Sequence, residues 1–259
     1  MQQPESDFSP ALVGPTPIAD PQASPVGQTL HAGSVALLSI PGVSRYREIL
    51  DLQHRLVERR LAGEIGDTVL MVEHHPVVTR GRGLQFTGVA RERSIPMAPL
   101  PAGVDFHEIE RGGDLTYHGP GQLVIYPIIH LEGRDVGAYI RRLEAAVIQT
   151  LRDFGLETST RTNATGVWTA DERKIASVGI AVRRWVTFHG IGLNVVNDLS
   201  AFQMISPCGF SPEVMTSLKV QGSDWEGLNP TNWSTLRSQI EASFMDAWNK
   251  TTPGGWLES

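Results

Sequence analysis

Residues 111–122 read RGGDLTYHGPGQ, and the apolar run LVIYPII follows at residues 123–129. Glycine lets a backbone approach a ligand closely and adopt positive φ, and proline stiffens a turn. Four glycines are interspersed here with an arginine, an aspartate, a tyrosine and a histidine, whose side chains can all contact a ligand. This mixture predicts a segment that lines a binding site, in preference to a loop that merely joins two strands.

The composition of the 259 residues, 41% apolar and 19% charged, is typical of a soluble globular protein. A net charge of −6 argues against general nucleic-acid binding. No apolar run approaches the ~20 residues that span a bilayer, so we expect no membrane insertion. The single cysteine, Cys208, excludes an internal disulfide framework and a multi-cysteine metal site. The first thirty residues have no basic and apolar signal pattern, so the predicted location is the cytoplasm.

The N-terminal third predicts a tail followed by a strand, a helix and a second strand. Residues 1–32 are rich in Pro, Ser, Gln and Ala, and we expect them to be disordered. Residues 35–40 (VALLSI) predict a buried first strand, and residues 68–73 (TVLMVE) predict a second. Ser44 is the expected N-cap of a helix that ends near residue 61.

The remainder of the chain mixes helices and strands without regular β-α-β alternation. Apolar side chains recur at helical spacing over residues 135–154, and the polar turn 171–173 predicts a hairpin between two of the strands. The other predicted elements are strands at 106–110, 123–129, 166–169, 174–184 and 185–196 and a helix at 233–248. The fold class is therefore α/β, as an α+β mixed sheet with flanking helices, in a single domain over residues 33–250.

No cofactor or metal site is predicted. Residues 74–83 form another polar turn with glycines, but the adjacent His74 and His75 would point to opposite faces of a strand, so we expect them to share no metal. Neither a Walker-type phosphate loop nor a dinucleotide fingerprint is present.

Cys208 lies in the turn Ser206-Pro207-Cys208-Gly209-Phe210. Cysteine is often buried and inert, but a thiol between proline and glycine suits a turn exposed to a pocket. A reactive role needs a nearby positive charge, because an unperturbed thiol has a pKa of about 8.5. Lys174, His118 and His189 are the candidates, and chemistry alone suggests a cysteine–histidine pair first.

Four segments, in this order, carry a resemblance to a known family. Together they resemble the lipoyl(octanoyl) transferases, which have the biotin/lipoate protein ligase catalytic-domain fold, and the resemblance covers roughly residues 34–245. The segments are RGGDLTYHGPGQL (111–123), KIASVGIAV (174–182), FHGIGLNV (188–195) and NDLSAFQMISPCGF (197–210). The proline-rich stretch 91–104 is longer than the family usually needs.

The resemblance implies roles for individual residues. It implies that Cys208 carries the acyl group as a thioester and that Lys174 lowers the pKa of this thiol, which replaces the cysteine–histidine pair. Asp114 stands where the family often has a neutral or basic residue, so its role is the least defined. The implied substrate-binding residues are Arg111, Gly112, Gly113, Asp114, Leu115, Thr116, Tyr117, His118, Ser177, Val178, Gly179, His189, Gly190 and Ile191.

The implied function is the first step of endogenous lipoate biosynthesis. An octanoyl group would pass from octanoyl-acyl carrier protein through Cys208 to a lysine ε-amine, without a cofactor. The acceptors would be the lipoyl domains of 2-oxoacid dehydrogenase E2 subunits and the glycine-cleavage H protein. Three alternatives stay open: an ATP-dependent lipoate or biotin ligase, an amidotransferase between lipoyl-type domains, and a non-catalytic acyl-binding protein. The cysteine in its PCG turn favours the transferase over the ligase.

Overall fold

The computed structural model divides the chain into two units, residues 1–33 and 34–259. Every described residue belongs to the second unit; these are residues 35–83, 96, 99–162, 164–205, 211–222 and 232–251. The predicted tail, residues 1–32, lies outside them, so the predicted domain boundary stays a prediction. Among the described residues, no helix combines the length and apolar character needed to cross a bilayer.

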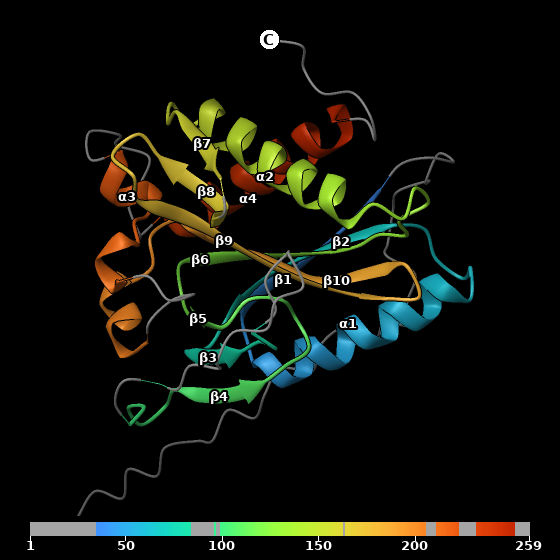
Figure 1. The fold of residues 1–259 in the computed structure, drawn as a ribbon, viewed down its shortest axis with the longest axis horizontal. Coiled ribbons are helices and arrows are strands. Elements are labelled where there is room, and N and C mark those ends of the chain that lie inside the picture. Colours follow the sequence, from blue (N-terminus) through green and yellow to red (C-terminus); the bar gives the residue numbers. More distant parts are fainter. Residues whose placement is uncertain are drawn as a thin grey trace, which may run out of the picture. The chain divides into compact units, whose positions relative to one another are not determined.

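A seven-stranded mixed sheet forms the centre of this unit (Figure 1). β1 runs parallel to β2, and every other neighbouring pair is antiparallel. In spatial order the strands are β1 (Ala36–Ser44), β2 (Thr68–His74), β6 (Gln122–Ile128), β10 (Val186–Asn194), β9 (Lys174–Arg183), β8 (Ala164–Thr169) and β7 (Thr158–Arg161). The predicted mixed sheet with flanking helices is thus confirmed.

Helices cover both faces of this sheet (Figure 1). Because side chains alternate along a strand, Met71 and Ile125 pack with α2 (Val136–Asp153) and α4 (Trp233–Lys250). Their neighbours Leu70 and Val124 face the other way and pack with α1 (Tyr46–Leu61). A hydrophobic layer therefore packs against each face of the sheet. The described residues also include three short helical segments: η1 (Leu199–Met204), η3 (Pro212–Val214) and α3 (Leu218–Gln221).

A second, three-stranded sheet contains part of the segment quoted at the outset. Its order is β4 (Asp105–Glu108), β3 (Val77–Arg80) and β5 (Leu115–His118). The sequence predicted turns or loops for 74–83 and 111–122, so strands β3 and β5 are a correction. Both strands have only four residues and are flanked by glycine, which leaves too short a stretch for alternation to be recognised.

Two details near the start of the sheet also differ from the sequence prediction. The first strand is not buried, because β1 lies at the sheet edge, and all its residues except Ser44 are half-buried or exposed. Ser44 ends β1 and does not cap α1; Arg45 stands at the N-cap, without a side-chain hydrogen bond. The helix over 135–154 and the hairpin at 171–173 are confirmed, and Asp135 caps α2 by accepting from Ala138 N–H at 2.8 Å.

Candidate active site

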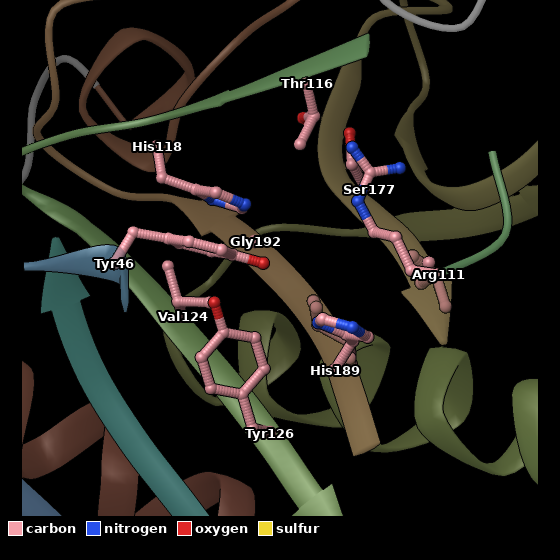
Figure 2. Close-up of a pocket in the computed structure, with 13 residues that line it drawn as sticks. Tyr46, Arg111, Thr116, His118, Val124, Tyr126, Ser177, His189 and Gly192 are labelled. Atoms are coloured by element: carbon pink, nitrogen blue, oxygen red, sulfur yellow. The ribbon is translucent and has the colours of Figure 1, made fainter. Parts of the chain in front are cut away.

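A small pocket lies between the two sheets, on the side of the large sheet that α1 covers. In the view of Figure 2, His118 and Tyr46 lie on one side of it and Arg111 and Ser177 on the other. Its open volume is about 30 Å³, enough for about two water molecules. The residues that line it are Tyr46, Arg111, Thr116, His118, Val124, Tyr126, Ser177, Val178, Gly179, His189, Gly190, Ile191 and Gly192.

Most of the substrate-binding residues expected from the sequence meet in this pocket. They come from three separate segments: β5 with the residues before it, the middle of β9, and the middle of β10. The expected residues that do not line the pocket are Gly112, Gly113, Asp114, Leu115 and Tyr117. Leu115 and Tyr117 point instead into a hydrophobic cluster with Phe202. Alternation along β5 explains this, because Thr116 and His118 take the opposite face.

Arg111 fixes the loop that precedes β5. Its guanidinium donates to the backbone oxygen and the hydroxyl of Thr79, both at 2.8 Å, and to Gly112 O at 3.0 Å. The backbone of this loop is bonded to the residues after β3, through Arg82 N–H to Arg111 O at 3.0 Å and Gly83 N–H to Gly113 O at 3.1 Å. Gly112 and Gly113 therefore shape the wall of the pocket without lining it.

A buried hydrogen-bond network determines which ring nitrogen of His118 carries the proton. Asn194 Nδ2 donates to the Thr216 carbonyl at 3.0 Å, so Asn194 Oδ1 accepts from Gln122 Nε2 at 2.8 Å. Gln122 Nε2 also donates to the Tyr117 carbonyl at 3.2 Å, which leaves Gln122 Oε1 facing His118 Nδ1 at 2.6 Å. That oxygen can only accept, so Nδ1 carries the proton.

His118 therefore presents an unprotonated nitrogen, Nε2, as a hydrogen-bond acceptor. Burial lowers the pKa of His118 to about 4, and the positive charge of Arg111 contributes to the same shift. The ring is neutral near pH 7. Within the described part of the chain, Nε2 makes no hydrogen bond.

His189 also lines the pocket and has an unusual backbone conformation. It is 1% exposed and has a φ of +56°, which is rare for a residue with a side chain and is frequent at functional sites. Gln53 Oε1 accepts from its backbone N–H at 2.8 Å. Among the described residues neither ring nitrogen has a hydrogen-bond partner, although Nε2 is 3.7 Å from Glu110 Oε2.

Glu110 is a carboxylate between two histidines. Besides His189 it contacts His54, whose Nε2 is 3.0 Å from Oε1. The side chain of His189 contributes most to lowering the pKa of Glu110, to about 2, so this carboxylate is ionised at neutral pH. Burial lowers the pKa of His189, and Glu110 opposes that shift.

Lys174, the first residue of β9, does not line the pocket. It precedes Ser177 by three residues, or about 10 Å along the strand. The side chain is nevertheless buried, at 4% exposure, and Nζ lies 5.3 Å from the centre of the Trp168 ring. Gly166 packs directly against it: a Cβ at residue 166 would lie 2.6 Å from Lys174 Cε and 3.3 Å from Nζ.

Cys208 lies in residues 206–210, outside the described residues. Residues 215 and 216, which follow this interval, pair with the backbone of Lys174. Thr216 N–H donates to the Lys174 carbonyl at 2.9 Å, and Met215 forms a parallel bridge with Lys174. Thr216 thus connects Lys174 to the network that ends at His118.

The described residues contain no group of three His, Cys, Asp or Glu side chains arranged to hold a metal ion. His74 and His75 differ as the sequence suggested: His74 is buried and His75 is exposed. His74 Nδ1 faces the Ser44 carbonyl at 3.4 Å, so its Nε2 accepts from the Tyr126 hydroxyl at 2.9 Å.

Residues 45–242 match the model of the lipoyl protein ligase A/B catalytic domain. The octanoyltransferase of Solibacter usitatus is 46% identical over 182 residues, covering 69% of this chain and 81% of the relative. The octanoyltransferase of Acidobacterium capsulatum is 44% identical over 194 residues, covering 69% and 77%.

The chain belongs to the lipoyl protein ligase A/B catalytic domain family. Because these relatives are named octanoyltransferase, it is an enzyme of the acyltransferase class. Among solved structures, the bipartite lipoate protein ligase of Thermoplasma acidophilum matches with a TM-score of 0.55 at 16% identity, covering 83% of each chain. At this identity the likeness concerns the fold alone, and it confirms the biotin/lipoate-ligase type of domain.

Several residues of the pocket and of the hydrogen-bond network around it were not expected from the sequence. Tyr46 and Tyr126 line the pocket, yet each occupies an apolar face of a helix or strand and looks like a core residue in the sequence. Gln122 and Asn194 lie inside the motifs that carry the resemblance, which is the signal that could have identified them. Glu110 directly precedes the first motif.

Proposed function

We propose that this chain transfers an octanoyl group from octanoyl-acyl carrier protein, through a thioester on Cys208, to a lysine ε-amine on a lipoyl domain. The observation that carries the proposal is the buried Lys174, whose carbonyl is bonded to the segment that follows Cys208. An ammonium beside a thiol favours the thiolate, which is the nucleophilic form. The nature of the acyl group is proposed from the name shared by the curated relatives.

The first half-reaction exchanges one thioester for another. The Cys208 thiolate attacks the carbonyl carbon of the octanoyl thioester, and the bond from that carbon to the carrier's sulfur breaks. The carrier leaves as a thiolate and takes a proton from solvent. The negative charge of Cys208 thus leaves with the carrier's sulfur, and Lys174 stays protonated throughout, which is the role proposed for it.

The second half-reaction forms an amide. A neutral lysine amine of the lipoyl domain attacks the octanoyl-Cys208 carbonyl, the carbon–nitrogen bond forms and the carbon–sulfur bond breaks. The proton lost by the nitrogen returns to the Cys208 sulfur or to solvent. An amide is more stable than a thioester, so this step needs no ATP. The proposed acceptors are lipoyl domains of 2-oxoacid dehydrogenase E2 subunits and the glycine-cleavage H protein, in the cytoplasm.

The pocket between the sheets is the proposed site of the octanoyl chain. Val124, Val178 and Ile191 supply apolar surface there, beside the polar groups described above. The open volume of about 30 Å³ is far less than an eight-carbon chain occupies, so binding requires the side chains around the pocket to move apart.

The intact mass of the protein after incubation with octanoyl-acyl carrier protein tests the proposal. Wild type should gain one octanoyl group without ATP and lose it when a lipoyl domain is added, whereas Cys208→Ser should gain none. An octanoyl adduct that also forms on Cys208→Ser would contradict the assigned nucleophile. Transfer that appears only with free octanoate and ATP would indicate a ligase instead.

A further inference from the structure

Glu144 is a buried carboxylate on α2 whose role no sequence motif explains. It is 6% exposed, and its Oε1 accepts from the backbone N–H of Gly166 at 2.7 Å. An ionised group is costly to bury unless an opposite charge or several hydrogen bonds compensate it. One backbone hydrogen bond is a small compensation for a carboxylate, so a second partner is expected nearby.

Lys174 is the candidate for that partner, because it also lies against Gly166. The same residue whose N–H binds Glu144 has no side chain, and the end of the Lys174 side chain fills the space where its Cβ would be. Glu144 and Lys174 therefore approach one glycine, the first from α2 and the second from β9. Burial raises the pKa of Glu144, while the Gly166 N–H and the charge of Lys174 lower it.

Three arginines lie near Lys174 or Glu144. Arg161 lies over the same Trp168 ring, with Cζ 4.8 Å from its centre. Arg173 adjoins Lys174 in sequence and donates to the Met215 carbonyl at 2.9 Å, and Arg141 acts electrostatically on Glu144 from its own helix. The two acidic residues of the turn before Lys174 are exposed: Glu172 is paired with Arg161 at 3.1 Å, and Asp171 accepts from Gln221 Nε2 at 3.2 Å. Among the described acidic residues near Lys174, Glu144 is thus the one that is buried.

We infer that Glu144 is a positioning residue that keeps Lys174 charged and in place against Gly166. This rests on the proposed function, in which Lys174 must remain an ammonium to stabilise the Cys208 thiolate. Burial and the neighbouring cations would otherwise make Lys174 lose its proton at a lower pH. The carboxylate supplies the charge that prevents this.

The lysine content makes a direct test practical. The chain has only three lysines, Lys174, Lys219 and Lys250, and the last two are exposed. Lysine labelled with ¹³C at Cε gives three NMR signals, and Lys174→Arg assigns the one of interest. In Glu144→Gln, which keeps the acceptor for Gly166 but removes the charge, the titration midpoint of Lys174 should fall by at least one pH unit.

Two further variants separate charge from structure. Glu144→Asp keeps the charge and should hold the midpoint within half a unit of wild type. Asp153→Asn removes an exposed charge from the same helix and should leave the midpoint unchanged. In activity assays, the alkaline limb of the pH–rate profile should shift to lower pH, together with the Lys174 midpoint, in Glu144→Gln alone.

An unchanged Lys174 midpoint in Glu144→Gln, or an equal shift in Asp153→Asn, would overturn the inference. A Glu144→Asp variant whose Lys174 midpoint falls by one pH unit or more would do the same, and this test holds even if the glutamine variant does not fold. Failure of the proposed function is a separate result, since it appears as the absence of an octanoyl adduct on wild type.

Discussion

Gly166 and Lys174 share one space: a Cβ at residue 166 would lie 2.6 Å from Lys174 Cε and 2.5 Å from the Ala176 carbonyl oxygen. Gly166 also has a φ of +131°, which other residues rarely adopt. The absence of a side chain at residue 166 is therefore a requirement for the position of Lys174.

Gly166→Ala should displace Lys174 and reduce octanoyl transfer by at least tenfold. The variant should also lose about 1–3 kcal/mol of stability from backbone strain, measured by urea unfolding. Gly63→Ala is the matched control, because Gly63 also has a positive φ but no atom lies within 4 Å of a Cβ there. Equal loss of transfer in both variants would show that strain, and not the displaced lysine, is responsible.

Lys174→Ala should raise the pH at which Cys208 is alkylated towards the ordinary thiol value of about 8.5 and reduce turnover at least a hundredfold. The physical reason is the loss of the ammonium that favours the thiolate. Iodoacetamide labelling against pH, read by intact mass, measures this for the single cysteine. Lys219→Ala, an exposed lysine on α3, should change neither quantity. A normal alkylation profile and normal turnover in Lys174→Ala would exclude the proposed pairing of Lys174 with Cys208.

His118 should be observed as the Nδ1–H tautomer, because Gln122 Oε1 accepts from it at 2.6 Å. Two-bond ¹⁵N–¹H spectra of histidine-labelled protein distinguish the two tautomers. Gln122→Met removes the acceptor and should shift His118 towards the Nε2–H form. Gln53→Met changes another buried glutamine near the pocket, one bonded to the His189 backbone, and should leave His118 as in wild type. An Nε2–H form in wild type would refute the assigned network.

Buried histidines should make the protein less stable as the pH falls from about 6.5 towards 4. The pKa of His118 is about 4 in the folded protein against 6.5 ordinarily, so the unfolded chain binds protons first. Its contribution, about 3 kcal/mol, is complete above pH 6.5 and is lost as the pH falls through this range. His74 and His189 shift in the same direction.

Urea unfolding between pH 7.5 and 5 measures this dependence, above the range in which Glu110 titrates. His118→Asn should flatten the slope, whereas His75→Asn, which changes an exposed histidine, should not. A free energy of unfolding that does not vary over this range would be inconsistent with neutral, buried imidazoles.

The sequence is informative where local chemistry decides the structure. Helix α2 was predictable because its apolar residues recur over five turns and Asp135 caps it. β3 and β5 were not predictable, because each has only four residues and they pair with each other from positions far apart in the sequence. In the site, the motifs predicted His118 and Ser177, but no local pattern pairs Gln122 with Asn194, which are 72 residues apart. Glu144 looks like any polar residue of an amphipathic helix until the fold brings Gly166 to it.

Thr216 contributes to the site through its peptide group: its N–H binds Lys174 and its carbonyl binds Asn194. Its side chain takes part in neither bond, so exchanging threonine for valine or serine leaves both intact. Only proline, which lacks the N–H, removes the bond to Lys174. Thr216 is also fully buried, and its hydroxyl accepts from Gln221 Nε2 at 3.2 Å, so a mutational scan would register large or charged substitutions as packing defects and would miss the two peptide-group bonds. In this enzyme, tolerance of a small side-chain change does not mean that the backbone at that position is dispensable.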